Sequence, residues 1–544
     1  MLSSILGTKE RVNIANKIRV DWSSSTSNTY VGIGRVAAWS VGDTSIPIVN
    51  NSITTVNSIF DNLFAVKKIT DSDMALVVPR YDWQYNTVYY NYTDYDDMTT
   101  NIDIDPMTNG SITVSSSNTN VYGTNTTFTL DFNVGDSIQY LNTADNTVDR
   151  REVINIISPT HIVVNSVFSV TLTTSYYYGY YDFTPRYAHP YYVRNTYDQV
   201  FKCLSNNYNW STSTETPSTY MPEIGLGGNL PTNPFIITDD GYKWKYMYTI
   251  PAGLKRKFFT ADWMPVVNEL QVTSSSVDGR IDIVDIINSG SGYNSNVPGA
   301  NVTIVSVSGN GTGANLSAVV DSSGAITGIN VLDGGSGYTY ANVIINDIVG
   351  SSGNGAILTP IISPHGGNGA NAEYELGATT FMLCTEIDGD EGGLIPVSTP
   401  SGNPFDYHQV SIIKNPALSS NSFVTASNSV YDMTLVVNMT PFTSNLFDTN
   451  DIAYQGVSYS SAYFTATIVN SDSVSRKVYL NNIRGSFDPT DALKTVNSKA
   501  SIPPVGITVS DVKTYTGDVL YVENRPMVTR SSDQTEQIKL IIQV

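Results

Sequence analysis

Residues 517–544 read GDVLYVENRPMVTRSSDQTEQIKLIIQV, and the last part of this stretch decides the kind of fold. Apolar side chains recur there at every second position, at Ile538, Leu540, Ile542 and Val544. Lys539 and Gln543 fall between them. Alternation with a period of two places the apolar side chains on one face of a β-strand. We predict that these residues close a sheet and that removing them unfolds a domain.

The same mostly β character extends over the whole chain. It contains 35 Tyr, 17 Phe, 40 Gly and 24 Pro, a mixture that favours strands separated by tight turns. Phe128, Leu130 and Phe132 alternate before a Gly135-Asp136 turn signal, and Ile138 and Tyr140 resume the pattern, which predicts a hairpin. The clearest helical stretch is residues 3–17, so we expect little helix.

The sequence also contains an internal repeat. IVDIINSGSGYNSNVPGANVTI (283–304) recurs as ITGINVLDGGSGYTYANVII (326–345), and a glycine-rich hairpin candidate follows each copy. Two copies are too few for a solenoid. We therefore predict a compact β module built from two similar halves.

Length and charge exclude several classes of protein. A chain of 544 residues corresponds to three or four folding units. Its 49 acidic and 29 basic residues give a net charge of -20, which argues against nucleic acid as a partner. We find neither a signal peptide nor an apolar run long enough to span a membrane, and we expect no membrane partner. The two cysteines, Cys203 and Cys384, are too far apart in sequence to indicate a disulfide framework or a metal site.

No motif for catalysis is evident. Nucleophile elbows and phosphate-binding loops are missing from the sequence, and the four histidines are widely separated, so we expect no enzyme activity, metal or cofactor. Pairs of acidic residues, such as Asp94 with Asp97 or Asp388 with Glu391, leave a glycan depolymerase open as an alternative.

Seven separated segments carry a resemblance to a known family: YVGIGRVAAWS (30–40), ALVVPRYDW (75–83), VFKCL (200–204), DGYKWKYMYTIP (240–251), WMPV (263–266), YHQVSIIKNPAL (407–418) and residues 517–544. Together they resemble the gene product 8 family of baseplate wedge subunits in T-even-like contractile-tailed bacteriophages. They occur in the family's order and, with their surroundings, cover about half of the chain.

The resemblance implies a homodimer with two β-sandwich-like or barrel-like domains, the second inserted into the first. Carried over to this chain, the first domain comprises residues 1–84, 376–418 and 508–544, and the second comprises 85–268. Three β modules are additions to the family scaffold: one at 107–168 within the second domain, the glycine-rich repeat at 269–375, and one at 419–507.

The shared segments place polar residues inside apolar strands, which normally requires partners because isolated buried charges are costly. They are Arg80, Asp82 and Trp83 in one segment and Glu523, Asn524, Arg525 and Pro526 in the other. Our hypothesis is that these two loops determine the fold by facing each other in the first domain. Ligand binding is the alternative.

The resemblance implies a structural subunit of a contractile-tail baseplate, which binds its own copy and neighbouring wedge proteins. Such a protein is assembled in the host cytoplasm and retained in the virion. A receptor-binding or polysaccharide-binding tail adhesin, with the added modules as glycan readers, is the main alternative.

Overall fold

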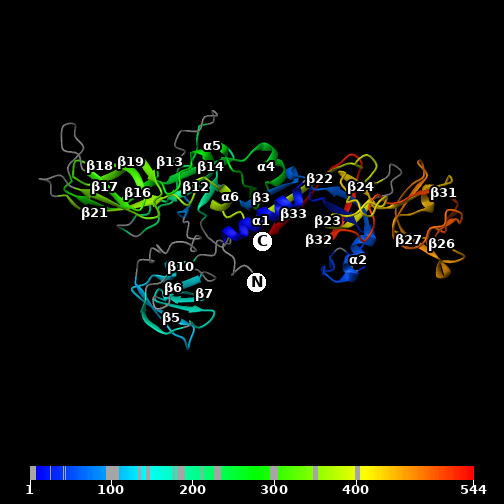
Figure 1. The fold of residues 1–544 in the computed structure, drawn as a ribbon, viewed down its shortest axis with the longest axis horizontal. Helices are drawn as coiled ribbons and strands as arrows, with labels where there is room; N and C mark the ends of the chain where they lie inside the picture. Colours follow the sequence, from blue (N-terminus) through cyan, green and yellow to red (C-terminus); the bar gives the residue numbers. More distant parts are fainter. Residues whose placement is uncertain are drawn as a thin grey trace. The chain divides into compact units, whose positions relative to one another are not determined.

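The computed structural model describes residues 8–544 except for 25, 41, 43, 93–109, 133–136, 143–146, 169, 176–177, 181–189, 210–211, 213, 226–234, 294–303, 347–352 and 399–404. The protein is mostly β, as predicted, with few helices (Figure 1). It divides into two compact units. Unit 1 comprises Met1–Val12, Val78–Lys255 and Phe259–Ala378, and unit 2 comprises Asn13–Val77, Arg256–Phe258 and Thr379–Val544.

Unit 2 is built on a five-stranded antiparallel sheet. Its order is β24-β2-β1-β23-β32, with β1 (Thr29–Gly34), β2 (Leu63–Lys68), β23 (Phe405–Lys414), β24 (Val430–Asp432) and β32 (Asp518–Arg530). All six residues of the central strand β1 are buried. Ser52 caps the N-terminus of helix α2 (Ile53–Asn62), because its hydroxyl accepts a hydrogen bond from the Thr55 amide. The helix packs Ile59 and Phe60 against the sheet.

The C-terminal strand closes a second sheet of unit 2, which confirms the alternation observed in the sequence. Strand β33 (Thr535–Gln543) pairs along β22 (Thr380–Asp388), which in turn pairs with β3 (Met74–Pro79). Ile538 and Leu540 are buried on the inner face, whereas Ile541, between them and the chain end, is 45% exposed.

A separate module of unit 2 covers the later part of the sequence. Its seven-stranded sheet has the order β30-β29-β26-β27-β28-β25-β31 and its own apolar core. The strands are β25 (Leu435–Met439), β26 (Ile452–Gln455), β27 (Phe464–Asp472), β28 (Lys477–Gly485), β29 (Leu493–Thr495), β30 (Ser501–Ile502) and β31 (Pro504–Thr508). We call this part the C module; its strands lie in the predicted 419–507 module, except that β31 ends one residue beyond it.

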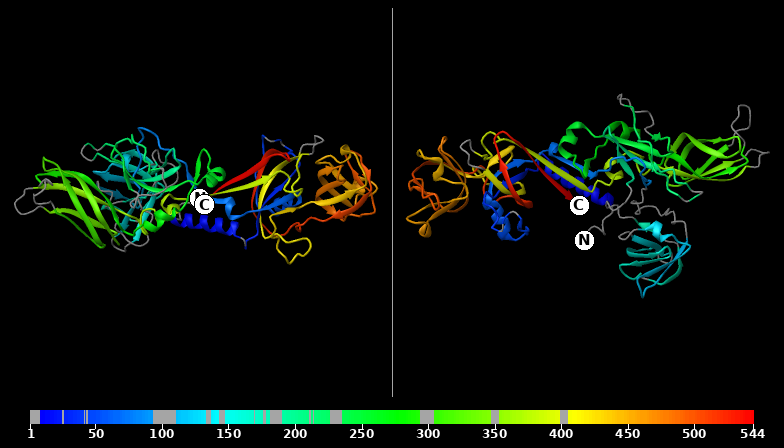
Figure 2. Two further views of the ribbon diagram at one scale, coloured as in Figure 1. Left: turned by 90° about the horizontal axis from the view of Figure 1, so that it is seen from above. Right: turned by 180° about the vertical axis from the view of Figure 1, so that it is seen from behind.

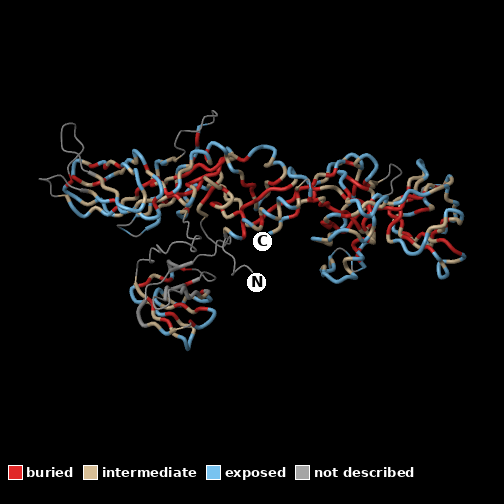
Figure 3. The backbone as a smooth tube through the Cα atoms, in the orientation of Figure 1, coloured by how far each residue is buried: buried red, intermediate tan, exposed pale blue. Residues whose placement is uncertain are grey.

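Unit 1 contains a four-stranded sheet with the order β11-β12-β14-β13. The strands are β11 (Tyr192–Arg194), β12 (Gln199–Ser205), β13 (Phe235–Ile237) and β14 (Lys243–Thr249). Every residue of β12 is buried. Trp244 of β14 is fully buried and stacks on Tyr242 with ring centroids 5.5 Å apart. Figure 3 shows this concentration of buried residues along the central strands.

The glycine-rich repeat forms a module of six strands, which we call the G module (Figure 2). In chain order they are β16 (Ile281–Ser291), β17 (Ile304–Gly309), β18 (Thr312–Val320), β19 (Ile326–Ser336), β20 (Ala341–Asn346) and β21 (Asn354–Ile362). The first three strands correspond to the last three: β16 pairs with β21, β19 pairs with β18, and β17 pairs with β20. The predicted two-half module is therefore present.

The repeated tyrosines explain why the glycines recur. Tyr293 of the first half accepts a hydrogen bond from the Ala356 amide of the second, and Tyr338 of the second half accepts one from the Ala314 amide of the first, at 3.1 and 3.4 Å. A side chain at Gly311 would place its Cβ 2.3 Å from the Tyr338 ring. Only glycine leaves room for the ring there.

Another module of unit 1 has a seven-stranded sheet with the order β10-β6-β7-β8-β5-β4-β9. Its strands are β4 (Ser111–Val114), β5 (Asn120–Thr124), β6 (Ser137–Asn142), β7 (Thr147–Ser158), β8 (His161–Val164), β9 (Leu172–Ser175) and β10 (Tyr178–Tyr180). The predicted strand at 128–132 is wrong: Phe128–Asp131 is a short helix, α3. The predicted Gly135-Asp136 turn lies outside the described residues, and β6 follows as expected.

The remaining elements are short apart from the first helix. The helix predicted at 3–17 is α1, but it occupies Thr8–Ser23, and residues 1–7 lie outside the described part of the chain. The other elements are α4 (Ala252–Phe258), β15 (Trp263–Pro265), α5 (Leu270–Ser275) and α6 (Ala372–Glu375).

Candidate functional site

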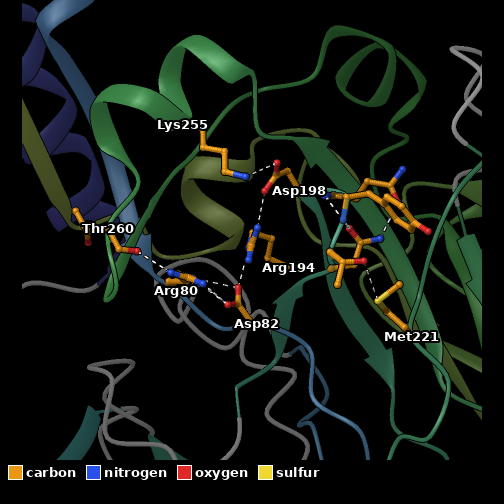
Figure 4. Close-up of polar contacts among 11 residues, drawn as sticks. Arg80, Asp82, Arg194, Asp198, Met221, Lys255 and Thr260 are labelled. Carbon is orange, nitrogen blue, oxygen red and sulfur yellow. Dashed lines mark hydrogen bonds and ion pairs between the residues drawn. The ribbon is translucent and has the colours of Figure 1, made fainter.

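Arg80 and Asp82 belong to a row of alternating charges in unit 1, which we call the Arg80 row: Arg80, Asp82, Arg194, Asp198 and Lys255 (Figure 4). The Arg80 guanidinium contacts both carboxylate oxygens of Asp82, with Nε 3.1 and 3.0 Å from Oδ1 and Oδ2. Arg194 Nε donates to Asp82 Oδ1 at 2.7 Å and its Nη1 to Asp198 Oδ1 at 2.5 Å. Lys255 Nζ completes the row at 2.8 Å from Asp198 Oδ2.

The Phe259 ring contacts all three cations of this row. Arg80 Cζ, Arg194 Cζ and Lys255 Nζ lie 4.5, 4.8 and 5.5 Å from its centroid. The negative face of an aromatic ring attracts such groups. The ring therefore offsets the repulsion among three positive charges that share two carboxylates.

The electrostatics of the row favour its ionised state. Partial burial by itself would raise the pKa of Asp82, but hydrogen bonds and charge from Arg80 and Arg194 outweigh burial, so the pKa is lowered. For Arg194, burial alone would lower the pKa, and the two aspartates reverse this effect and raise it.

Backbone pairing fixes the geometry of the row. The Arg194 amide donates to the Tyr81 carbonyl at 2.7 Å, and the Trp83 amide donates to the Arg194 carbonyl at 2.8 Å. The Trp83 indole donates to the Ser218 hydroxyl at 3.1 Å, and Arg80 Nη1 to the Thr260 carbonyl at 3.0 Å. The row and the adjacent Trp83 therefore connect β11 with the segments around residues 80–83, 218 and 260.

The second predicted set is in a strand rather than a loop. Residues 523–526 lie within β32, at the edge of the five-stranded sheet of unit 2. Asn524 Oδ1 accepts from Gln409 Nε2 at 2.7 Å, and its Nδ2 donates to the Pro47 carbonyl at 2.9 Å. Arg525 and Glu523 form an ion pair at 3.4 Å, and Pro526 is exposed, as an edge strand permits.

The expectation that the two sets face each other in one domain therefore needs correction. Arg80, Asp82 and Trp83 lie in unit 1 and residues 523–526 in unit 2, and the described hydrogen bonds and ion pairs of each set go to residues of its own unit. The polar residues are paired, as we argued from the cost of burial, but with partners that the sequence did not indicate.

A more deeply buried charged cluster attaches the G module to the sheet of unit 1. Lys202 of β12 is fully buried, and its ammonium contacts the Glu375 carboxylate and Asn368 Oδ1, the latter at 2.6 Å. Asn368 Nδ2 then donates to Asp282 of β16 at 2.6 Å. We call these four residues, together with Lys245, the Lys202 joint.

Backbone amides and an aromatic ring complete the coordination in this joint. Glu375 also accepts hydrogen bonds from the Gly369 amide, at 2.8 and 2.9 Å, and from the Asn371 amide at 3.2 Å. The Lys202 ammonium lies 3.7 Å from the centroid of the Tyr92 ring. Glu375 is thus bonded on several sides, as a buried carboxylate requires.

Lys245 of β14 adds a second buried amine. Burial, together with the charge of Lys202, lowers its pKa to about 8, although Asp282 and Glu375 oppose the shift. Burial raises the pKa of Asp282. A less buried pair, Lys243 with Asp285 at 2.6 Å, lies at the same contact between β14 and β16.

Within unit 2, a second and more exposed charged cluster attaches the C module to α2. Arg484 of β28 donates two hydrogen bonds to Asp61, at 2.9 and 2.6 Å, and the Tyr515 hydroxyl contacts the same carboxylate. Asn481 Nδ2 donates to the Asn62 carbonyl at 2.9 Å. We call Asp61, Asn62, Asn481, Arg484 and Tyr515 the Arg484 joint.

The structure gives local roles to one of the two acidic pairs considered for catalysis. Glu391 pairs with Lys67 at 2.5 Å and accepts the Asp388 amide, and Asp388 accepts from the Thr535 hydroxyl. Asp94 and Asp97 lie outside the described residues. In the described part of the chain, no group of three His, Cys, Asp or Glu side chains is placed to hold a metal.

Sequence reasoning missed both joints and most of the Arg80 row. One signal was available: Lys202, Lys243 and Lys245 interrupt apolar strands in VFKCL and DGYKWKYM. A lysine surrounded by buried positions requires a carboxylate partner. Glu375 and Asp282 could not be named as those partners, because they are remote in sequence.

In comparisons with known proteins, no protein-family model matches the sequence, and no curated protein matches it. Within the described residues, none of the helices has the length and apolar character needed to cross a bilayer.

Proposed function

We propose that this protein is a structural subunit of the baseplate wedge of a contractile phage tail, which binds its own copy and neighbouring wedge proteins. The sequence segments that resemble the gene product 8 family suggest this function. Several of them coincide with core strands: residues 30–40 include most of β1, 200–204 lie in β12, 240–251 include β14, and 407–418 include most of β23. β1 and β12 are buried throughout.

The observation that carries the proposal is the attachment of the added modules by charged joints. The Lys202 joint is buried and connects the G module to β12 and β14, and the Arg484 joint connects the C module to α2. A buried ion pair adds little stability compared with an apolar pair of similar volume, so we infer that the Lys202 joint serves to fix the orientation of the G module. A building block of a large assembly needs such fixed orientation, since its contacts with neighbours are defined in space.

Reconstitution tests the proposal. The purified protein is mixed with the other wedge proteins of the same phage, and assembly is followed by light scattering and electron microscopy. We expect a larger particle that contains this chain. The Glu375→Gln variant, which weakens the Lys202 joint, should enter fewer particles than the Asp285→Asn variant. A chain that never joins a particle, and is absent from purified virions, would contradict the proposal.

A further inference from the structure

The C module contains a pocket that the proposed function does not use. It has a volume of about 310 Å³, at the low end of the range typical of small-molecule sites, about 300–1,000 Å³. Strands β26, β29 and β30, the loop between β29 and β30, and the short 3-10 helix Tyr459–Ser461 line it. Its lining side chains include Tyr454, Tyr459, Lys494, Lys499 and Ser501.

Two tyrosines form the aromatic wall. Tyr454 and Tyr459 pack edge to face, with centroids 5.9 Å apart and an interplanar angle of 64°. Tyr459 is 48% exposed, so part of its surface is available to a ligand. A tyrosine offers a large apolar surface with few rotatable bonds, at a small cost in entropy.

Two lysines supply the charge. Lys494 pairs with Tyr454 across neighbouring strands, and its ammonium is held by the Gly456 carbonyl at 2.6 Å and lies 3.5 Å from Asp491. Lys499 is exposed, and the structure gives its ammonium no hydrogen bond or ion pair with any described residue. Lys494 is therefore fixed and largely neutralised, whereas the charge of Lys499 is available.

The backbone at Lys499 is unusual. Its φ is +53°, in the left-handed region where glycine or asparagine is the ordinary choice. A lysine held in this conformation costs free energy relative to glycine, and residues kept in such conformations concentrate at binding sites. The ammonium is thereby placed at the pocket by the turn between β29 and β30.

We propose that this pocket binds an acidic saccharide, with a sugar ring against Tyr459 and a sugar carboxylate on Lys499. A sugar ring has an apolar face suited to an aromatic side chain, and an ammonium forms charge-assisted hydrogen bonds with a carboxylate. The formal charge of the whole chain is -20, so long-range attraction does not explain anion binding here and the contact must be local. This inference does not rest on the proposed function.

Titration calorimetry on the full chain tests the inference with three probes: a hexamer of galacturonic acid, a neutral hexamer of glucose, and inorganic phosphate. We expect binding of the acidic hexamer that is at least ten-fold tighter than binding of either other probe. Raising the salt concentration should weaken it. No binding of the acidic hexamer, or equal binding of the neutral hexamer or of phosphate, overturns the proposal.

Matched variants locate the site. Lys499→Gly removes the charge at a position whose backbone suits glycine, so the fold is retained, and we expect about five-fold weaker binding. Arg476→Gly is the control, since it removes a cation at φ +59° in the same module outside the pocket. Tyr459→Ala should weaken binding about ten-fold. Equal effects of Lys499→Gly and Arg476→Gly would refute the assignment.

Discussion

Replacing Glu375 by glutamine removes one charge from the Lys202 joint and keeps its shape. Lys202 is 0% exposed, so its ammonium would remain buried beside Asn368 and the Tyr92 ring but without the Glu375 carboxylate. Breaking a buried ion pair in this way costs about 3–5 kcal/mol. At about 2–4 °C per kcal/mol for a domain of this size, the corresponding unfolding transition should fall by roughly 6–20 °C.

Differential scanning calorimetry measures this shift, and hydrogen exchange locates it. We expect faster exchange in β12, β14 and β16, because the joint connects them. Asp285→Asn is the control: its pair with Lys243 is partly exposed, with side chains 20% and 21% accessible, and should contribute under about 1 kcal/mol.

The double variant Lys202→Met with Glu375→Gln separates charge from packing. It removes both charges, so most of the lost stability should return. Two results would show that the reasoning about a buried, coupled pair is wrong. One is that Glu375→Gln lowers the transition temperature by less than 2 °C. The other is that the double variant loses more stability than the two single variants lose together.

Three further predictions follow from other residues. Lys245→Met should stabilise the protein at pH 7 by up to about 3 kcal/mol, because the folded state disfavours the charged ammonium of Lys245. This gain in unfolding free energy should disappear as the pH rises from 8 to 10.5. Denaturant titrations across that range measure the gain, and a gain that does not change with pH would disprove the prediction. Arg80→Ala should lower the melting temperature by a few degrees, because it removes the hydrogen bond to the Thr260 carbonyl and one of the two arginines that contact Asp82. A thermal scan with an unchanged melting temperature would contradict the role given to the Arg80 row. Deleting residues 535–544 removes β33 with its buried apolar residues and should make unit 2 sensitive to proteolysis. If the shortened chain keeps the near-UV circular dichroism spectrum and the cleavage pattern of the full chain, β33 is dispensable.

Sequence periodicity was sufficient to predict secondary structure where the pattern extends over many residues. The alternation at 538–544 identified β33, and the repeat of residues 283–304 identified the two-half module, because both signals extend over many positions. The short stretch Phe128–Phe132 was not sufficient. Its two phenylalanines are spaced for one turn of a helix as well as for alternate strand positions. Phe128 begins α3 and Phe132 directly follows it, and both are buried with ring centroids 5.9 Å apart.

Partners in charged clusters could not be predicted from one sequence. That Arg80 and Asp82 need partners follows from the cost of burying charge, but Arg194, Asp198 and Lys255 are brought to them only by tertiary folding. For the same reason, residues 523–526 were placed opposite the wrong segment. The requirement for a partner is local, whereas its identity depends on the whole chain.

The crossed tyrosine contacts of the G module have a consequence for its origin. Each half supplies the amide that the tyrosine of the other half needs, and β16 and β19 each pair with a strand of the opposite half. A peptide of half the length could form these hydrogen bonds and strand pairs only with a second copy of itself. The free-energy cost of that association depends on the peptide concentration. Tandem duplication within one gene makes that encounter intramolecular, so the fused pair folds equally well when dilute.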